Sequence, residues 1–222
     1  MLAAGRGERL LPLTDELPKA LVEVNGSSLL ERHLQRLAAA SVETVVINTG
    51  WQGDKIVAGF GGGSRYGLQI VYSPEYDNVL ETGGGIVRAL PLLGEQPFWV
   101  INADIVTDWA LSTPRLPDSV LAHLVLVPNP DYRANGDFDL VNGRVCNNAV
   151  APYTYSGIAC YSPAFFRGHG SGRFSVAPLL QAAADAGTLS GEIHSGLWAD
   201  VGTPARLAAV NELLRSQANA RA

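Results

Sequence analysis

Short apolar runs alternate with amphipathic segments along the first part of the chain. Leu30, Leu34 and Leu37 recur at helical spacing, and Ser27 or Ser28 before them suits the N-cap of a helix. The same criteria predict strands over residues 43–48, 68–72, 98–101 and 121–127, and helices over residues 54–60 and 82–90. Helices that alternate with apolar strands predict an α/β fold with a mostly parallel sheet.

The pattern changes between residues 137 and 161, where short strand-like runs are joined by turns such as Asn142-Gly143. We expect strands over residues 137–141, 144–146 and 153–161, which form a small β section over one side of the cleft. A helix over residues 175–186, a strand over 197–201 and an amphipathic helix from Pro204 follow. Neither a repeat nor a linker interrupts the pattern, which predicts a single domain over residues 1–222.

Composition narrows the class of protein. A chain of 222 residues with 47% hydrophobic content has enough apolar side chains for a sizeable core. A net charge of −5 argues against a nucleic-acid-binding surface, which needs a basic face. Cys146 and Cys160 lie in apolar, strand-like contexts, and we identify neither a signal peptide nor an apolar run of membrane-spanning length. We therefore expect two buried, free thiols, no membrane partner and a cytoplasmic location.

Near the N-terminus, the string GRGERLLPLTDELPKAL carries the strongest chemical signal. Gly5 and Gly7 favour a loop with exposed backbone N–H groups, which can surround a phosphate chain. Arg9 and Lys19 add cations that suit phosphate oxygens. The string is neither a dinucleotide fingerprint, because Leu10 stands at the third glycine, nor a Walker A loop, because it lacks Gly-Lys-Ser/Thr.

The whole string resembles the signature of the sugar-1-phosphate nucleotidylyltransferases, G-x-G-x-R-x-x-P-L-T-x-x-x-P-K-x-L, and every fixed position is filled. The resemblance implies a Rossmann-like three-layer sandwich of the nucleotide-diphospho-sugar transferase type. It also implies attack of a sugar 1-phosphate oxygen on the α-phosphorus of a nucleoside triphosphate, with pyrophosphate as leaving group. Gly5, Arg6 and Gly7 would then contact phosphates, Arg9 the leaving pyrophosphate, and Lys19 both the α-phosphate and the incoming phosphate. Such folds have a longer stretch before the glycine loop, so the first strand is short or the chain lacks some native residues.

Two aspartates, far apart in the sequence, each follow an apolar stretch. Asp104 ends FWVINAD, and Asp200 lies within LWADVGT. Carboxylates at the carboxyl ends of strands suit Mg²⁺, although each aspartate taken singly is better suited to cap the turn or helix that follows. The segments resemble the family's Asn-Gly-Asp and W-x-D-x-G-T motifs, with Ala103 in place of the glycine. The resemblance therefore implies that Asp104 and Asp200 hold Mg²⁺.

The same resemblance implies that other segments bind the base of the nucleotide and the sugar. Residues 80–85, LETGGG, open an expected helix with small residues against which a flat base fits; a plain glycine-rich helix start is the alternative. The further candidates for nucleotide binding are Leu2, Ala3, Glu75, Thr82, Gly83, Gly84 and Asn102. The candidates for sugar binding are Glu81, Asp137, Tyr155, Ser156 and Gly157.

One departure from the wider family concerns the sugar phosphate. Many hexose-1-phosphate thymidylyl- and guanylyltransferases carry a Glu-Lys pair before the sugar-binding strand, whereas this chain has Cys146-Asn147-Asn148 there. Contact with the sugar phosphate then falls to Lys19, to the metal, or to an arginine such as Arg144.

The segments LETGGG, GDFDL, YSGI and GEIHSGLWADVGT most resemble the N-acetylmuramate-1-phosphate uridylyltransferases of cell-wall sugar recycling. This resemblance implies UTP and N-acetylmuramate α-1-phosphate as substrates. Arg133 and Arg173 are then candidates for the lactyl carboxylate, and surface salt bridges are the alternative for both.

Three other interpretations stay open. The first is another NDP-sugar pyrophosphorylase, such as a mannose-1-phosphate guanylyltransferase, and the second is transfer onto a non-sugar phosphate such as phosphocholine. The third is a catalytically inactive nucleotide-binding regulatory domain. Retention of Arg9, Lys19, Asp104 and Asp200 argues against the third, because positioned charge is what the reaction requires.

Overall fold

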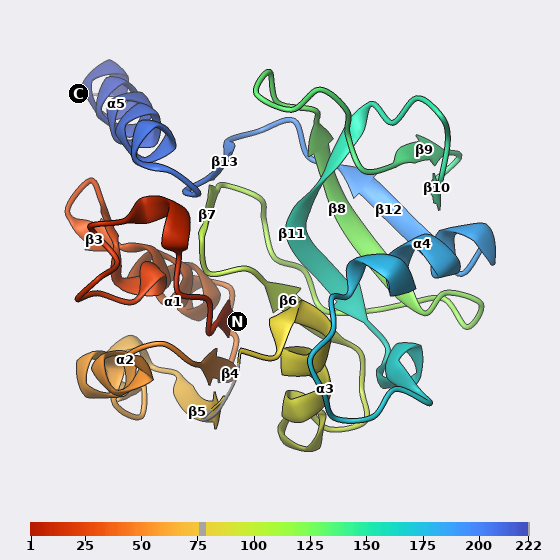
Figure 1. Ribbon diagram of the computed structural model, residues 1–222, viewed down its shortest axis with the longest axis horizontal. Helices are drawn as coiled ribbons and strands as arrows, with labels where there is room; N and C mark the ends of the chain where they lie inside the picture. Colours follow the sequence, from red (N-terminus) through yellow and green to blue (C-terminus); the bar gives the residue numbers. More distant parts are fainter. Residues whose placement is uncertain (76–78, 222) are drawn as a thin grey trace. The chain divides into compact units, whose positions relative to one another are not determined.

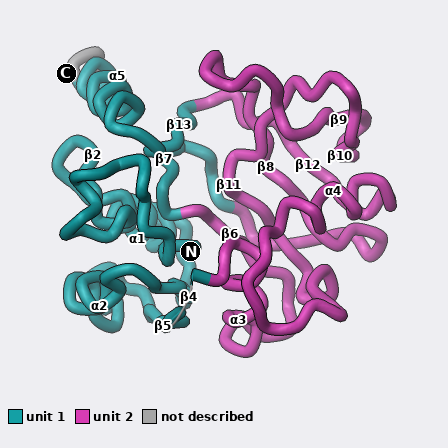
Figure 2. The backbone as a smooth tube through the Cα atoms, in the orientation of Figure 1, with its two compact units in different colours: residues 1–79, 103–111, 197–222 teal, residues 80–102, 112–196 magenta. Residues whose placement is uncertain are grey.

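The computed structural model describes residues 1–75 and 79–221 of the chain (Figure 1). It divides into two compact units (Figure 2). Unit 1 comprises residues 1–79, 103–111 and 197–222, and unit 2 comprises residues 80–102 and 112–196. Because both units combine segments from separate parts of the chain, the division does not test the single domain predicted over residues 1–222, which stays a prediction.

Unit 1 contains a three-stranded parallel sheet in the order β1-β4-β5. The strands are β1 (Leu2–Ala3), β4 (Thr44–Thr49) and β5 (Gln69–Pro74). Two antiparallel pairs accompany the sheet: β2 (Glu23–Val24) with β3 (Ser27–Ser28), and β7 (Ile105–Thr107) with β13 (Trp198–Asp200). The helices are α1 (Leu29–Ala39), α2 (Gly53–Phe60) and α5 (Pro204–Arg221), with short 3-10 turns at Glu8–Leu10, Lys19–Leu21 and Ser64–Tyr66.

Unit 2 contains a six-stranded sheet in the order β6-β11-β8-β12-β10-β9. The strands are β6 (Phe98–Ile101), β8 (Ala122–Pro128), β9 (Asp139–Val141), β10 (Arg144–Cys146), β11 (Tyr153–Tyr161) and β12 (Leu189–Ile193). The β8–β12 pair is parallel, and the other pairs are antiparallel. The helices are α3 (Glu81–Leu93) and α4 (Ala177–Asp185), with a 3-10 turn at Pro163–Phe166. Among the described residues, no helix combines the length and the apolar character that crossing a membrane requires.

The predicted elements are present with boundaries displaced by a few residues at most, and α1 illustrates why. Ser28 is its N-cap, and the Ser28 hydroxyl accepts a hydrogen bond from the Glu31 amide at 3.2 Å. Leu30 and Leu34 are fully buried and Leu37 nearly so, as the helical spacing predicts. Local signals of this kind depend on neighbouring residues alone, so the sequence shows them directly.

Several short strands were not predicted. The β2–β3 hairpin turns at Asn25 and Gly26, with φ of 49° and 81°, and each of its strands has two residues, too few for an alternating pattern. Strand β7 follows directly after Asp104 and has only three residues. Strand β12 contains Gly191, where a Cβ would lie 2.8 Å from a methyl group of Val145. A glycine inside a strand weakens the sequence signal, and close packing against β10 is its reason here.

A hydrophobic cluster holds together the elements of unit 1 that carry the candidate phosphate and metal residues. Its buried members are Leu10, Val22, Val24, Leu29, Val106, Val201 and Val210. Leu10 follows Arg9, Val106 comes two residues after Asp104, and Val201 follows Asp200. Burial of each such side chain contributes about 1.5–3 kcal/mol, so the core fixes the backbone beside each charged residue.

Both cysteines are free thiols in unit 2, as predicted, but only Cys160 is buried, so the predicted burial of Cys146 is wrong. Cys146 ends β10 and is partly buried. Cys160 lies inside β11, and its burial raises the pKa of the thiol to about 12. A thiol with so high a pKa is almost entirely protonated at neutral pH and is therefore a poor nucleophile.

His33 makes the stability of the folded chain depend on pH. The ring is buried in α1, and burial, with Arg36 nearby, lowers the imidazole pKa from 6.5 to about 3. The unfolded chain therefore binds one more proton than the folded chain between these values, so stability falls as pH drops below about 6.5. We expect a slope of up to roughly 1.4 kcal/mol per pH unit in the free energy of unfolding from this residue.

Urea unfolding between pH 7 and pH 5 checks this prediction. His33→Leu is expected to flatten the pH dependence, because it removes the buried imidazole. Equal slopes for wild type and His33→Leu would contradict a neutral, buried His33.

Candidate active site

Hydrogen bonds within the signature loop, residues 5–18, join residues of the sequence motif. Gly7 has φ 73°, a left-handed conformation that favours glycine, and its carbonyl accepts hydrogen bonds from the Leu10 amide at 2.8 Å and the Thr14 hydroxyl at 2.9 Å. A Cβ on Gly7 would lie 3.0 Å from the Cβ of Lys19, so glycine also permits close packing there. A Cβ on Gly5 would meet nothing within 4 Å, which leaves room for a ligand beside its backbone.

Lys19 and Asp104 form the central ion pair of unit 1. The Lys19 ammonium lies 2.5 Å from Oδ2 of Asp104, and the two residues are 85 positions apart in the sequence. The Lys19 side chain is only 14% exposed, because its aliphatic stem packs against Gly7 while its ammonium reaches the carboxylate. The structure thus brings together one predicted phosphate ligand and one predicted metal ligand.

Asp104 and Asp200 are neighbours at the β7–β13 pair. Asp200 lies opposite Ile105 in the register, and the amide of Val201 donates to the Asp104 carbonyl at 2.8 Å. Both carboxylates are partly exposed, at 31% and 22%. The two aspartates that the sequence separates by almost a hundred residues therefore lie on adjacent backbone segments of unit 1, and their role as metal ligands stays a prediction.

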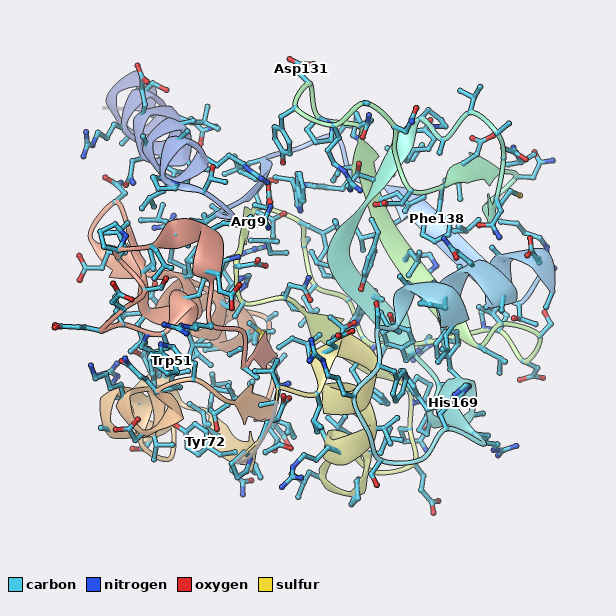
Figure 3. The ribbon with its side chains drawn as sticks, viewed as in Figure 1. Arg9, Trp51, Tyr72, Asp131, Phe138 and His169 are labelled. Carbon is cyan, nitrogen blue, oxygen red and sulfur yellow. The ribbon has the colours of Figure 1, made fainter. Side chains whose placement is uncertain are left out.

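Arg206 is a site residue that sequence analysis missed. Its guanidinium forms an ion pair with Oδ2 of Asp200 from the first turn of α5, and its backbone amide donates to the Thr203 hydroxyl at 3.3 Å. A Cβ on Gly202 would lie 3.2 Å from guanidinium nitrogens of both Arg9 and Arg206, so the two arginines converge there; Figure 3 labels Arg9. An arginine in the first turn of a helix is unfavourable, because that end of the helix dipole is positive. This unfavourable position was the one feature of the sequence that pointed to a carboxylate partner for Arg206.

The charges around this edge favour a polyanion. Arg9, Lys19 and Arg206 are three cations, and Asp104 and Asp200 are two carboxylates, which leaves one positive charge. The partial burial of both ion pairs strengthens such interactions relative to bulk water. Unit 1 can therefore bind phosphate groups through fixed charges and through the backbone of the signature loop.

The pair of aspartates also fits a magnesium ion. Carboxylate oxygens are ligands that Mg²⁺ prefers, and it retains several waters or phosphate oxygens beside one or two carboxylates. The described residues contain no group of three or more His, Cys, Asp and Glu side chains suited to a metal. Two carboxylates at adjacent strands, each partly exposed, match the small protein contribution that Mg²⁺ needs beside phosphates.

The other nucleotide candidates of unit 1 form a hydrogen-bonded chain at the ends of the parallel sheet. Leu2 and Ala3 make up β1, and the Ala3 amide donates to Oδ1 of Asn48 at 2.9 Å. The side-chain Nδ2 of Asn48 in turn donates to the Glu75 carboxylate at 2.7 Å. Glu75 is buried, so its carboxylate orients Asn48 and, through it, β1. Asn48 was not among the predicted site residues.

In unit 2, the glycines predicted to face a base pack against a neighbouring backbone. The amides of Gly83 and Gly84 both donate to the Phe174 carbonyl, at 3.0 and 3.1 Å. A Cβ on Gly83 would clash with the Phe174 ring, and one on Gly84 would clash with the Gly172 carbonyl. The Thr82 hydroxyl accepts from the Val176 amide at 3.0 Å. Close approach of residues 172–176 is thus a sufficient reason for these small residues, and nucleotide binding by them stays a prediction.

Asn102, Ser156 and Gly157 lie together beside the irregular register of β11. The Asn102 amide donates to the Gly157 carbonyl at 2.9 Å, and a Cβ on Gly157, with φ 84°, would lie 2.7 Å from Nδ2 of Asn102. The Ser156 hydroxyl is buried and donates to the Val125 carbonyl at 2.6 Å. The register between β11 and β8 shifts between Tyr155 and Ile158, so Ser156 stabilises a bulge, a feature common beside binding sites.

The arginines considered for the sugar have protein partners. Arg133 forms a bidentate ion pair with Asp137, at 2.8 and 3.0 Å, and Asp137 also accepts from the Tyr155 amide at 2.9 Å. Arg173 pairs with Glu81 at 2.9 Å, and Glu81 has the positive φ of 60° that is uncommon for glutamate. Arg144 donates to the Gly187 carbonyl. The structure therefore supports the salt-bridge alternative for Arg133 and Arg173.

Comparison with known proteins decides the family. The family model described as nucleotidyl transferase matches residues 1–114, just over half of the chain. The chain is 45% identical over 216 residues to the N-acetylmuramate alpha-1-phosphate uridylyltransferase of Neisseria meningitidis, which covers 93% of this chain and 94% of that protein. This chain belongs to the nucleotidyl transferase family.

A second relative agrees with that membership, and two solved structures share the fold. The protein of the same name from Caulobacter vibrioides is 38% identical over 94% of this chain and 93% of its own length. The crystal structure of HddC from Yersinia pseudotuberculosis matches at a TM-score of 0.76, with 20% identity, 96% of this chain and 97% of that chain. A UDP-glucose pyrophosphorylase complexed with UDP-glucose matches at 0.75, with 15% identity and 97% of both chains. The predicted Rossmann-like fold of the nucleotide-diphospho-sugar transferases is confirmed, whereas the individual site roles stay predictions.

Proposed function

We propose that this family member transfers a uridylyl group from UTP to N-acetylmuramate α-1-phosphate, giving UDP-N-acetylmuramate and pyrophosphate. The observation that carries the reaction type is the Lys19–Asp104 ion pair beside Asp200, with Arg9 nearby. The substrate pair rests on the two uridylyltransferases, whose identity extends over more than nine-tenths of both chains. A role in peptidoglycan sugar recycling and a cytoplasmic location belong to the same proposal.

The residues of unit 1 would bind and orient the phosphates. An oxygen of the sugar phosphate attacks the α-phosphorus, and the bond from that phosphorus to the pyrophosphate oxygen breaks in line. The attacking phosphate is already ionised, so no general base is needed. Lys19 would neutralise charge where the two phosphates meet, and Arg9 would neutralise the leaving pyrophosphate, because positioned cations are most effective where charge develops. The signature loop would hold the triphosphate through backbone N–H groups.

Mg²⁺ belongs to the proposal, with Asp104 and Asp200 as its protein ligands. When bound, the ion would neutralise negative charge on phosphate oxygens. Removal of divalent cations with EDTA is expected to abolish formation of the UDP-sugar, measured by chromatography, and added Mg²⁺ is expected to restore it. Asp200→Asn is expected to raise the half-saturating Mg²⁺ concentration at least about tenfold. Asp118→Asn, at an exposed loop position, is the control, and an unchanged Mg²⁺ requirement in Asp200→Asn would contradict a ligand role.

A substrate panel tests the proposed reaction. UTP, GTP, dTTP and CTP are each combined with the 1-phosphates of N-acetylmuramate, N-acetylglucosamine, glucose and mannose, and pyrophosphate release is measured with Mg²⁺. Preference for UTP with N-acetylmuramate 1-phosphate is the expected result. Activity with a different pair would retain the chemistry and replace the substrates, and no product from folded protein would contradict transferase activity altogether.

Guanylyl transfer to mannose 1-phosphate is the second candidate. A mannose-1-phosphate guanylyltransferase of Mycobacterium tuberculosis is 38% identical over 107 residues, which cover 48% of this chain and 30% of that protein. That match is confined to part of each chain, whereas the uridylyltransferases match along their length. Uridylyl transfer is therefore the better supported of the two.

A further inference from the structure

Three consecutive carbonyls of the signature loop accept hydrogen bonds from one turn at the start of α2. Trp51 Nε1 donates to the Thr14 carbonyl at 3.2 Å, and Gln52 Nε2 donates to the Asp15 carbonyl at 2.7 Å. The Lys55 ammonium donates to the Glu16 carbonyl. We name Trp51, Gln52 and Lys55 the loop clamp. All three side chains come from unit 1, and Figure 3 labels Trp51.

The turn that carries the clamp is itself held tightly. The Trp51 amide donates to the Ala4 carbonyl at 3.4 Å, directly after β1. A Cβ on Gly50 would lie 2.5 Å from that carbonyl oxygen, and a Cβ on Gly53 would lie 2.7 Å from the Cβ of Thr49. Gln52 has φ 50°, a left-handed conformation that is costly for glutamine and persists only where surrounding contacts hold it. The turn is therefore packed closely against the ends of β1 and β4.

The clamp connects to the reacting groups through Thr14. Thr14 is completely buried; its carbonyl accepts from Trp51, and its hydroxyl donates to the Gly7 carbonyl. Gly7 packs against the stem of Lys19, whose ammonium contacts Asp104. A continuous series of contacts thus links the start of α2 to the Lys19–Asp104 pair.

Trp51 has a second contact in the same loop. The guanidinium carbon of Arg6 lies 4.4 Å from the centroid of the Trp51 ring, a cation–π geometry. Arg6 is otherwise exposed, and its ion pair with Asp15 is long, at 3.9 Å. The indole therefore restrains a side chain that faces solvent from the glycine-rich part of the loop.

We propose that Trp51, Gln52 and Lys55 are positioning residues that hold the signature loop in its phosphate-binding conformation. The loop needs external donors because residues 11–13, 15 and 16 are exposed and contribute few buried contacts. Ordering such a segment costs conformational entropy, and a loop ordered before binding does not incur that cost when the triphosphate arrives. The proposal rests on the proposed function only in assigning the triphosphate to this loop.

Donor-deleting substitutions test the clamp kinetically. Trp51→Phe removes the N–H group while keeping a ring beneath Arg6, and Gln52→Met and Lys55→Met remove donors while keeping side-chain length. Each is expected to lower kcat/KM for UTP about threefold to tenfold, and the triple variant about a hundredfold, since each lost hydrogen bond contributes modestly. The KM for UTP should rise more than the KM for the sugar 1-phosphate. Lys55→Arg, which retains a donor, should stay near wild type.

Two matched variants control for the chemistry of the substitutions. Trp99→Phe deletes an indole donor to the Ser112 carbonyl in unit 2, and Gln69→Met alters an exposed glutamine on β5. Trp99 lies on β6 and Gln69 on β5, outside the signature loop and the clamp, and both variants are expected to keep wild-type kinetics.

Hydrogen exchange supplies a readout that does not depend on turnover. Within the loop, the amides of Leu10, Leu13 and Asp15 donate to local carbonyls, so they report on its conformation. The triple variant is expected to exchange these amides at least about tenfold faster, with exchange in unit 2 unchanged.

Unchanged exchange or unchanged UTP kinetics in the triple variant would overturn the proposal. If that variant does not fold, the single variants are judged by the same two measurements. If the wild type does not turn over UTP with N-acetylmuramate 1-phosphate, the proposed function fails, while exchange and calorimetric binding of MgUTP still decide the clamp.

Discussion

Asp104→Asn is expected to lower kcat for UDP-sugar formation about a thousandfold at saturating substrates, a loss typical of removing one positioned electrostatic group. The substitution keeps the size of the side chain but removes the negative charge that pairs with Lys19 at 2.5 Å. It would also remove one of the two proposed carboxylate ligands for Mg²⁺. The fold should survive, because losing this partly buried, charged hydrogen bond costs about 1.5–3 kcal/mol, which is less than the roughly 5–15 kcal/mol by which folded domains are stable.

Thermal unfolding and steady-state kinetics separate these effects for Asp104. Asp108→Asn is the matched control, because Asp108 lies four residues further along on an exposed position of the same segment. It is expected to show nearly wild-type kcat. A wild-type rate in Asp104→Asn would remove Asp104 from the reaction, and a variant that melts far below wild type would make the residue structural.

Lys19→Met is expected to lower kcat about a hundredfold or more, since it deletes the cation while retaining the stem that packs against Gly7. The ammonium contacts Asp104 in the structure and would neutralise both phosphates in the proposed reaction. Lys19→Arg should recover part of the rate, because it restores charge but not the compact point geometry of an ammonium. Pyrophosphate release at saturating UTP is the measurement.

A double variant tests whether the pair acts as a unit. Asp104→Asn combined with Lys19→Met should lose much less activity than the product of the two single losses, because residues in direct contact are not additive. Independent, multiplicative losses would mean that the two side chains serve separate steps. A Lys19→Met variant that is unstable yet normally active per folded molecule would assign Lys19 to the fold.

Local patterns account for what the sequence predicts well. The helical spacing of Leu30, Leu34 and Leu37 behind a serine cap identifies α1, and the apolar run before Asp104 identifies β6. Strands β2, β7 and β12 escape prediction because two of them are very short and the third contains a glycine. Such strands are stabilised by their partners rather than by their own composition.

Contacts between distant segments account for what the sequence leaves undecided. Gly83 and Gly84 look like a surface for a flat base, yet their amides meet the Phe174 carbonyl, ninety or so residues away. Arg133 and Arg173 look like ligands for a carboxylate, yet each pairs with a carboxylate of the protein itself. A residue type predicts the kind of partner it needs, whereas the fold selects which partner is near.

The sequence by itself determined the α/β fold class, the signature loop and the charged residues on which the proposed phosphate chemistry depends, since these are properties of residue type and spacing. Only the tertiary structure decided that Lys19 contacts Asp104, that Arg206 pairs with Asp200, and that Trp51, Gln52 and Lys55 bind the loop carbonyls. The physical reason is that a hydrogen bond or ion pair depends on positions within a few ångströms, and the packed core of unit 1, not sequence proximity, sets those positions.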